Sequence, residues 1–346
     1  MSSLSARAEI LLRTLVDRYI SDGQPVGSRT LAKQAGLEVS PATVRNVMAD
    51  LEELGLVVSP HTSAGRIPTQ KGYRVFVDSL LKIQPLRADT IKTLRGELGH
   101  AGDPQQLMAS ASGMLSHLSS MAALVTLPRH AERSGFKQIE FVGLSGTRVL
   151  VILVSQDGQL QNRVIHTDRS YSPAELVEAA NYFNDTYTGQ TLEQVKQALA
   201  AEMKLDSETM AHAMRTAVNM AQQVFQEDGE PESLVVSGES NLMEFPDLGD
   251  MKKMRHLFDA FNTKRDLLHL LDRSERETGV KIFIGNESGY QPLEQCSVVT
   301  APYEVDNEIV GTLAVVGPTR MAYERVIPLV DITARLLSGA LSSDNE

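Results

Sequence analysis

The side chains with the clearest chemical role lie near the N-terminus, on a segment that begins at Ser40-Pro41 and carries Thr43, Arg45 and Asn46. Arginine can form paired hydrogen bonds with guanine, asparagine can do the same with adenine, and threonine can contact either base type. These residue types in one short segment indicate a surface that reads base edges in double-stranded DNA. The alternative is that Arg45 and Asn46 belong to an ordinary solvated helix face.

The segment must be a helix for these side chains to share one face. Serine followed by proline favours a helix start, because serine can accept a first-turn amide and proline gives up only an amide that would be unpaired. We predict a helix from Pro41 to Leu54, ended by Gly55, with a buried stripe formed by Val44, Val47, Met48, Leu51 and Leu54. Its acids, Asp50, Glu52 and Glu53, fall at the C-terminal end, where they stay away from phosphates. This arrangement is typical of a recognition helix.

The flanking sequence predicts the elements that would hold such a helix. Periodicity predicts a helix over 4–20, and Ser28 is expected to cap a second one over 29–35, ended by Gly36. Residues 56–58 and 66–68 form a predicted hairpin, and Thr69 caps a fourth helix. Helix, turn, helix and hairpin is the winged-helix order.

Three further cations are placed to hold the phosphate backbone. Arg29, Arg66 and Lys71 would mostly contact phosphate, with Arg66 reaching out from the wing unless it is a plain surface arginine. The complete set of residues expected to bind DNA is Arg29, Ser40, Thr43, Arg45, Asn46, Arg66 and Lys71.

The charge distribution is compatible with this interpretation. The chain has a net charge of −11, but residues 1–80 hold nine Lys/Arg against eight Asp/Glu and so carry +1. The acidic excess therefore lies in the rest of the chain. A near-neutral domain can bind DNA if its charges separate by face.

The remainder of the chain mixes strands and helices, so the fold class is α+β with several domains. Residues 86–104 predict a short helix followed by a flexible joint. Residues 138–144, 148–155 and 159–167 alternate as a three-stranded meander, and helices are predicted over 173–187, 191–203 and 207–226. Further on, a helix is expected over 250–271, strands over 233–237, 280–285, 296–305 and 309–316, and a closing helix despite Pro328. Propensity alone does not choose among α+β folds.

Three N-terminal motifs resemble the HrcA family of heat-inducible transcription repressors. They are Val26-Gly27-Ser28-Arg29-Thr30-Leu31-Ala32, the run from Val39 to Glu52, and Thr62-Ser63-Ala64-Gly65-Arg66-Ile67-Pro68-Thr69 followed by Gly72-Tyr73-Arg74. The run from Gly311 to Met321 is similar to the family's C-terminal signature.

The resemblance implies a domain plan and a set of partners. The plan is a winged helix-turn-helix DNA-binding domain (1–82), a linker (83–104), a GAF-like domain (105–135 and 230–342) and an inserted α/β dimerisation domain (136–229). The protein would bind an inverted-repeat operator of chaperone operons as a homodimer and be relieved on heat stress. The GroE chaperonin would help to hold it in its active state.

Motifs for catalysis or metal binding are missing from the sequence. It contains no P-loop, no dinucleotide fingerprint after a strand and no HExxH, and Gly143-Leu144-Ser145-Gly146 is not a nucleophile elbow. The single cysteine, Cys296, is expected to be a small buried strand residue and fits a reducing cytoplasm. No secretory signal or membrane-spanning run is present. We therefore expect a cytoplasmic protein that is not an enzyme, has no cofactor or metal, and does not bind membranes.

Two other classes of function are alternatives to the repressor hypothesis. A GAF-like domain could bind a small molecule that controls DNA affinity, which rests on fold analogy alone. An enzyme carrying an accessory winged helix is the second alternative, and the lack of a nucleophile, metal or phosphate motif argues against it.

Overall fold

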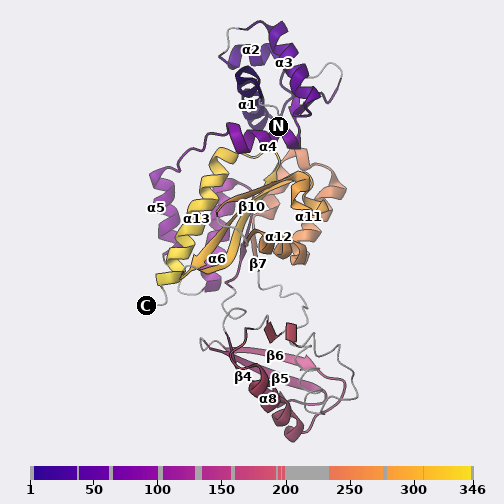
Figure 1. Cartoon of the computed structure of the whole chain (residues 1–346), viewed down its shortest axis with the longest axis vertical. Helices are drawn as coiled ribbons and strands as arrows, with labels where there is room; N and C mark the ends of the chain where they lie inside the picture. Colours follow the sequence, from indigo (N-terminus) through magenta and orange to yellow (C-terminus); the bar gives the residue numbers. More distant parts are fainter. Residues whose placement is uncertain are drawn as a thin grey trace. The chain divides into compact units, whose positions relative to one another are not determined.

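The structure is a computed structural model, and the chain divides into two compact units (Figure 1). The first unit joins Met1–Pro128 with Pro231–Glu346, and the second is Arg129–Glu230. The structure describes residues 4–36, 39–61, 65–99, 104–128, 135–156, 160–191, 194–195, 197–198, 234–275, 279–306 and 308–343.

The N-terminal part of the first unit is a winged helix. Its elements are α1 (Ala6–Asp22), α2 (Ser28–Gln34), α3 (Pro41–Glu53), β1 (Val57–Val58), β2 (Ile67–Pro68), α4 (Gln70–Val75) and a π-helical turn η1 (Phe76–Leu80). The strands pair antiparallel as the predicted hairpin. Leu11, Leu12 and Leu15 of α1 pack with Leu31, Val44 and Leu51 to form the core that holds the three helices together.

Two details of this domain differ from the sequence prediction. Ser28 is the first residue of α2, and Gly27 occupies the N-cap position without a side-chain hydrogen bond, so the expected serine cap is wrong. Leu54 is 41% exposed, because it caps α3 after the helix has turned past its buried stripe. Val44, Met48 and Leu51 are buried as predicted.

The rest of the first unit, which we call the body, is a sheet covered by helices on both faces (Figure 1). Five antiparallel strands lie in the order β7-β3-β10-β9-β8. The strands are β3 (Ala122–Thr126), β7 (Leu234–Ser237), β8 (Lys281–Ile284), β9 (Cys296–Val305) and β10 (Glu308–Pro318). One face packs on α5 (Ala88–Leu98), α6 (Pro104–Ser119) and α13 (Tyr323–Ser343), and the other packs on α11 (Met251–Thr263) and α12 (Arg265–Glu275). Short turns complete it: η2 (Glu239–Glu244), η3 (Pro246–Leu248), η4 (Gly285–Ser288) and η5 (Gln291–Leu293).

Several elements of the body were predicted differently from the sequence. The short helix expected within the linker, 83–104, is present as α5, but its Leu94 and Leu98 are buried, so this segment packs into the body. The single helix expected over 250–271 is two helices, because Lys264 adopts a left-handed φ of 58° between them. Strand β3 was not predicted. Cys296 is buried in β9 as expected.

The second unit contains the predicted meander, and its bounds, Arg129–Glu230, include the whole segment 136–229 that was expected to be the insert. Strands β4 (Phe136–Gly143), β5 (Arg148–Ser155) and β6 (Leu160–His166) form an antiparallel sheet, and α8 (Pro173–Tyr187) covers one face. Ser172 starts α8 with a capping box to Glu175. The helices predicted over 191–203 and 207–226 lie mostly outside the described residues. Within the described part of the chain, no helix is long and apolar enough to cross a membrane.

Candidate nucleic-acid interface

The N-terminal end of α3 is fixed by its own cap. The Ser40 hydroxyl accepts a hydrogen bond from the Thr43 amide at 3.1 Å, and the two hydroxyl oxygens lie 3.0 Å apart. Ser40 is exposed and Thr43 is half-buried. The cap leaves other first-turn amides free of helix partners, which is the arrangement that accepts a phosphate oxygen at a helix N-terminus.

The buried stripe of α3 decides which side chains face outward. Val44 and Met48 lie in the core at 0% and 3% exposure. The helical period then directs Arg45 and Asn46 to the opposite side, where both are exposed. Among the described residues, no ion pair or side-chain hydrogen bond is found for either side chain. Their donors are therefore available to a ligand, as base readout requires.

At its C-terminal end, α3 is tied to the wing by Glu52. One carboxylate oxygen accepts the Ser59 amide at 3.1 Å, and the other accepts Arg66 Nε at 3.0 Å with Nη2 at 2.8 Å. Glu52 thus holds both sides of the hairpin, since Ser59 follows β1 and Arg66 precedes β2. From the sequence, Glu52 was expected only to stay away from phosphate, and its role in holding the hairpin was not predicted. No local signal pairs residues 52 and 66, because the contact depends on how the hairpin folds back.

The wing is also held against the loop between α1 and α2. Val26 and Arg66 exchange both backbone hydrogen bonds at 2.9 Å. Gly65 is required beside this bridge, because a Cβ atom there would lie 2.4 Å from the carbonyl carbon of Val26. The position of Arg66 is therefore set by its backbone as well as by Glu52.

Lys71 lies at the C-terminal end of α3. Its ammonium donates to the carbonyl oxygen of Leu54 at 2.8 Å, a favourable place for a cation beside unpaired helix carbonyls. Thr43 and Leu54 are separated by roughly 16 Å of helix. The structure therefore brings together Ser40, Thr43, Arg45 and Asn46, while Arg66 and Lys71 gather at the other end of α3. Arg29 is exposed on the neighbouring helix α2.

Other kinds of site are not visible in the described part of the chain. No group of three or more His, Cys, Asp or Glu residues could hold a metal ion there. The chemistry that this domain offers is hydrogen bonding and charge, presented by an anchored helix and an adjoining wing.

Comparison with known proteins agrees with this geometry. Residues 3–80 match a family model described as "Winged helix-turn-helix transcription repressor, HrcA DNA-binding", and residues 105–327 match "HrcA protein C terminal domain". The chain belongs to the HrcA family of heat-inducible transcription repressors. The winged helix and the family were both predicted correctly from the sequence, and the chain is a transcription repressor rather than an enzyme.

The likeness to a curated relative and to a solved structure extends over nearly the whole chain. The heat-inducible transcription repressor HrcA of Methylobacillus flagellatus is 49% identical over 344 residues, covering 99% of this chain and 100% of the relative. A crystal structure described as that of a hypothetical protein has a TM-score of 0.62 at 22% identity, covering 99% of this chain and 100% of that one. The latter likeness concerns the fold alone.

Proposed function

We propose that this chain binds an inverted-repeat operator of chaperone operons as a homodimer and represses transcription until heat stress relieves it. The observation that carries the proposal is the anchored α3, whose exposed face presents Arg45 and Asn46 beside a capped N-terminal turn. Thr43, Arg45 and Asn46 would read base edges. Ser40 would contact DNA at the start of the helix, and Arg29, Arg66 and Lys71 would mostly hold phosphate.

Two of the proposed phosphate contacts, Arg66 and Lys71, lie at the C-terminal end of α3, away from Arg45 and Asn46. Arg66 and Lys71 already have partners within the chain, Glu52 and the Leu54 carbonyl. Each still has donors left over, since a guanidinium has five N–H groups and an ammonium three. We propose that they contact the backbone beside the wing without leaving these partners.

The homodimer is supported by an apolar sheet face in the second unit. The face that α8 does not cover carries six apolar residues and, in the same cross-strand rows, three polar ones: Val142, Leu150, Ile152, Val154, Leu160 and Val164, with Gln138, Glu140 and Asn162. Leu160 is 62% exposed and Val164 46%, and cross-strand neighbours place Val142, Leu150 and Val164 in one row. Exposed apolar surface of this kind marks association sites. A second copy is the natural occupant, because an inverted repeat has two equivalent half-sites.

The body and its partners complete the proposal. We propose that the five-stranded sheet with helices on both faces is the GAF-like domain implied by the family resemblance, that the second unit is its dimerising insert, and that the protein works in the cytoplasm. The GroE chaperonin is proposed as the partner that maintains the active state. A ligand-controlled regulator is less well supported: the cavity beside Cys296, lined also by Leu248, Met254 and Leu257, measures about 100 Å³, whereas small-molecule sites usually have about 300 Å³ or more.

Binding to labelled duplexes tests the proposal. The purified protein is titrated against an inverted repeat from upstream of a chaperonin operon and against a scrambled duplex, at several salt concentrations, with and without chaperonin. We expect tight, salt-dependent binding to the repeat alone. Equal weak binding to both duplexes, with chaperonin present, would remove the operator assignment.

A further inference from the structure

The winged helix is joined to the body by two arginines that cross the contact in opposite directions. Arg74 extends from α4 of the winged helix into the body, and Arg320 extends from the turn between β10 and α13 towards α1. We call this contact the head–body contact, with the winged helix as the head. It lies within the first unit of the chain.

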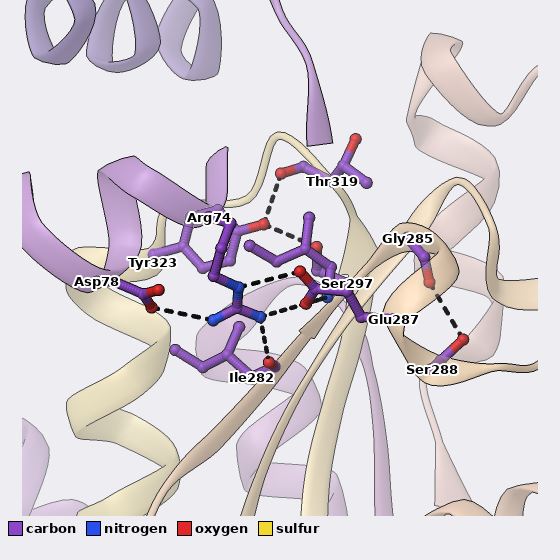
Figure 2. Close-up of polar contacts among 10 residues, drawn as sticks. Arg74, Asp78, Ile282, Gly285, Glu287, Ser288, Ser297, Thr319 and Tyr323 are labelled. Atoms are coloured by element: carbon purple, nitrogen blue, oxygen red, sulfur yellow. Dashed lines mark hydrogen bonds and ion pairs between the residues drawn. The ribbon is translucent and has the colours of Figure 1, made fainter. Parts of the chain in front are cut away.

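Arg74 is almost completely occupied by its partners (Figure 2). Its Nε donates to Glu287 at 3.0 Å, Nη2 donates to the same carboxylate and to the carbonyl oxygen of Ile282 at 2.6 Å, and Nη1 donates to Asp78 at 3.1 Å. Glu287 also accepts the Ile284 amide at 2.9 Å, so it is fixed by its own turn. The hydrogen bonds that Arg74 donates to Glu287 raise the pKa of Arg74 above its ordinary value, although burial opposes the change.

Arg320 forms the second tie and is only 16% exposed. Its Nε donates to Asp247 of the body, and Nη1 donates to the carbonyl oxygen of Ile20 near the end of α1 at 3.4 Å. Gly23, which caps α1 with a φ of 65°, passes so close that a Cβ atom there would lie 3.0 Å from the guanidinium carbon. A cation at the C-terminal end of α1 is favoured by the helix dipole.

A buried tyrosine pair lies between head and body. Tyr73 of α4 is 3% exposed, Tyr323 of α13 is 0% exposed, and their ring centroids are 6.3 Å apart. The Tyr323 hydroxyl donates to the Thr319 carbonyl at 2.7 Å and lies 2.7 Å from the Ser297 hydroxyl (Figure 2). Gln70 adds a hydrogen bond to the Glu294 carbonyl at 3.2 Å. The head is therefore held by an apolar centre with polar ties around it, which fixes one orientation rather than a range of them.

We propose that Arg74 and Arg320 are positioning residues for operator binding, because they hold the winged helix in one orientation on the body. Neither guanidinium faces DNA in this arrangement, since both are engaged in the head–body contact. The proposal rests on the proposed function, in which two heads of one dimer meet two half-sites. A head fixed on its body raises the effective concentration of the second head after the first has bound, whereas a loose head must be ordered on each binding event.

Methionine variants test the proposal, because methionine keeps much of the side-chain stem and removes the charge. Arg74→Met, Arg320→Met and the double variant are compared with Arg87→Met, whose side chain is 83% exposed and pairs with Asp89 at the surface. Fluorescence anisotropy measures the Kd of the full-length protein for the inverted repeat and for a duplex with a single half-site. Circular dichroism checks that each variant is folded.

We expect each single variant to bind the inverted repeat about tenfold more weakly, with binding to the single half-site and the salt dependence unchanged. Trypsin cleavage after Lys82, in the exposed segment that follows the head, should be faster in both variants and unchanged in Arg87→Met. This second measurement reports on the head–body contact without DNA.

Each contrary result overturns the proposal in its own way. Equal weakening on both duplexes with a smaller salt dependence would make the arginines phosphate contacts. Tighter binding by the variants would mean that the docked head restrains DNA binding. If the wild-type protein prefers the inverted repeat and the variants bind it equally tightly, the positioning role alone is wrong. If the wild-type protein itself has no preference for the inverted repeat, the proposed function is wrong as well.

Discussion

At the residue scale, the two side chains on the outward face of α3 that could read bases differ from the cations that have partners within the domain. Arg45 and Asn46 are exposed beside a core formed by Val44 and Met48, whereas Arg66 is held by Glu52. Base readout needs donors that are free before DNA arrives, and phosphate contact tolerates donors that are shared. The two groups should therefore respond differently to substitution.

Arg45→Ala should weaken operator binding by about 1–3 kcal/mol and relax the preference at one base position. The physical reason is that alanine removes a paired contact with a base edge and leaves the helix anchored by its buried face. Kd values for duplexes with single base changes measure the effect, and Arg87→Ala serves as a surface control. An equal loss on operator and random DNA would identify Arg45 as a phosphate contact instead.

Glu52→Gln should loosen the wing without unfolding the head. The variant weakens the hydrogen bonds to Ser59 and Arg66, and the expected cost is about 1 kcal/mol because the carboxylate is partly exposed. Hydrogen exchange measured by mass spectrometry should show faster exchange in peptides covering the hairpin. The neighbouring Glu53→Gln is the matched control, since Glu53 is exposed. Unchanged exchange in both variants would contradict the role assigned to Glu52.

At the element scale, the sequence identified elements whose signals are local and missed those decided by tertiary contact. The Ser40-Pro41 and Ser172-Pro173 starts both appear as predicted, because cap and first turn involve adjacent residues. Strand β3 was missed because Ala122–Thr126 is buried on both faces and lacks alternation. The break at Lys264 was missed because a non-glycine residue gave no signal for a left-handed φ.

In the candidate DNA-binding site too, local signals could be predicted from the sequence and tertiary contacts could not. The exposed face of α3 could be predicted from helical period and residue type. The Glu52 tie and the head–body contact could not, because Arg66 and Arg74 find their partners through the fold: Glu52 is 14 positions away and Glu287 is 213. Arg74 was quoted only as part of a family motif, and nothing in its neighbourhood distinguishes it from a surface arginine.

Helix α5 gives a prediction at this scale, because the short helix expected in the linker packs into the body instead of standing apart from it. Leu94 is 0% exposed and packs in the same core as α6 and α13. Leu94→Ala should therefore lower the free energy of unfolding by about 2–5 kcal/mol. Urea unfolding followed by circular dichroism measures it, with Lys92→Ala as the exposed control on the same helix. A Leu94→Ala variant as stable as the control would contradict the packing role assigned to α5.

At the scale of the whole molecule, the proposed function needs two heads on one assembly, and the free sheet face of the second unit is where the copies would join. Val164→Lys puts a charge into the row of Val142, Leu150 and Val164 on that face, on the edge strand β6. We expect the dimer to dissociate at micromolar concentration, because burying an unpaired ammonium is costly. Light scattering after size-exclusion chromatography measures the mass. Affinity for the inverted repeat should fall by about 100-fold, towards that of a single half-site.

Val177→Lys is the matched control for this experiment. Val177 is 58% exposed, belongs to the same unit and lies on α8, which covers the opposite face of the sheet. Both variants add one charge at an exposed valine, so only the face differs. If Val177→Lys stays dimeric while Val164→Lys becomes monomeric with unchanged half-site binding, the free sheet face is the interface. If Val164→Lys stays dimeric, the copies join elsewhere, and the spacing of the two half-sites has to be explained by another surface.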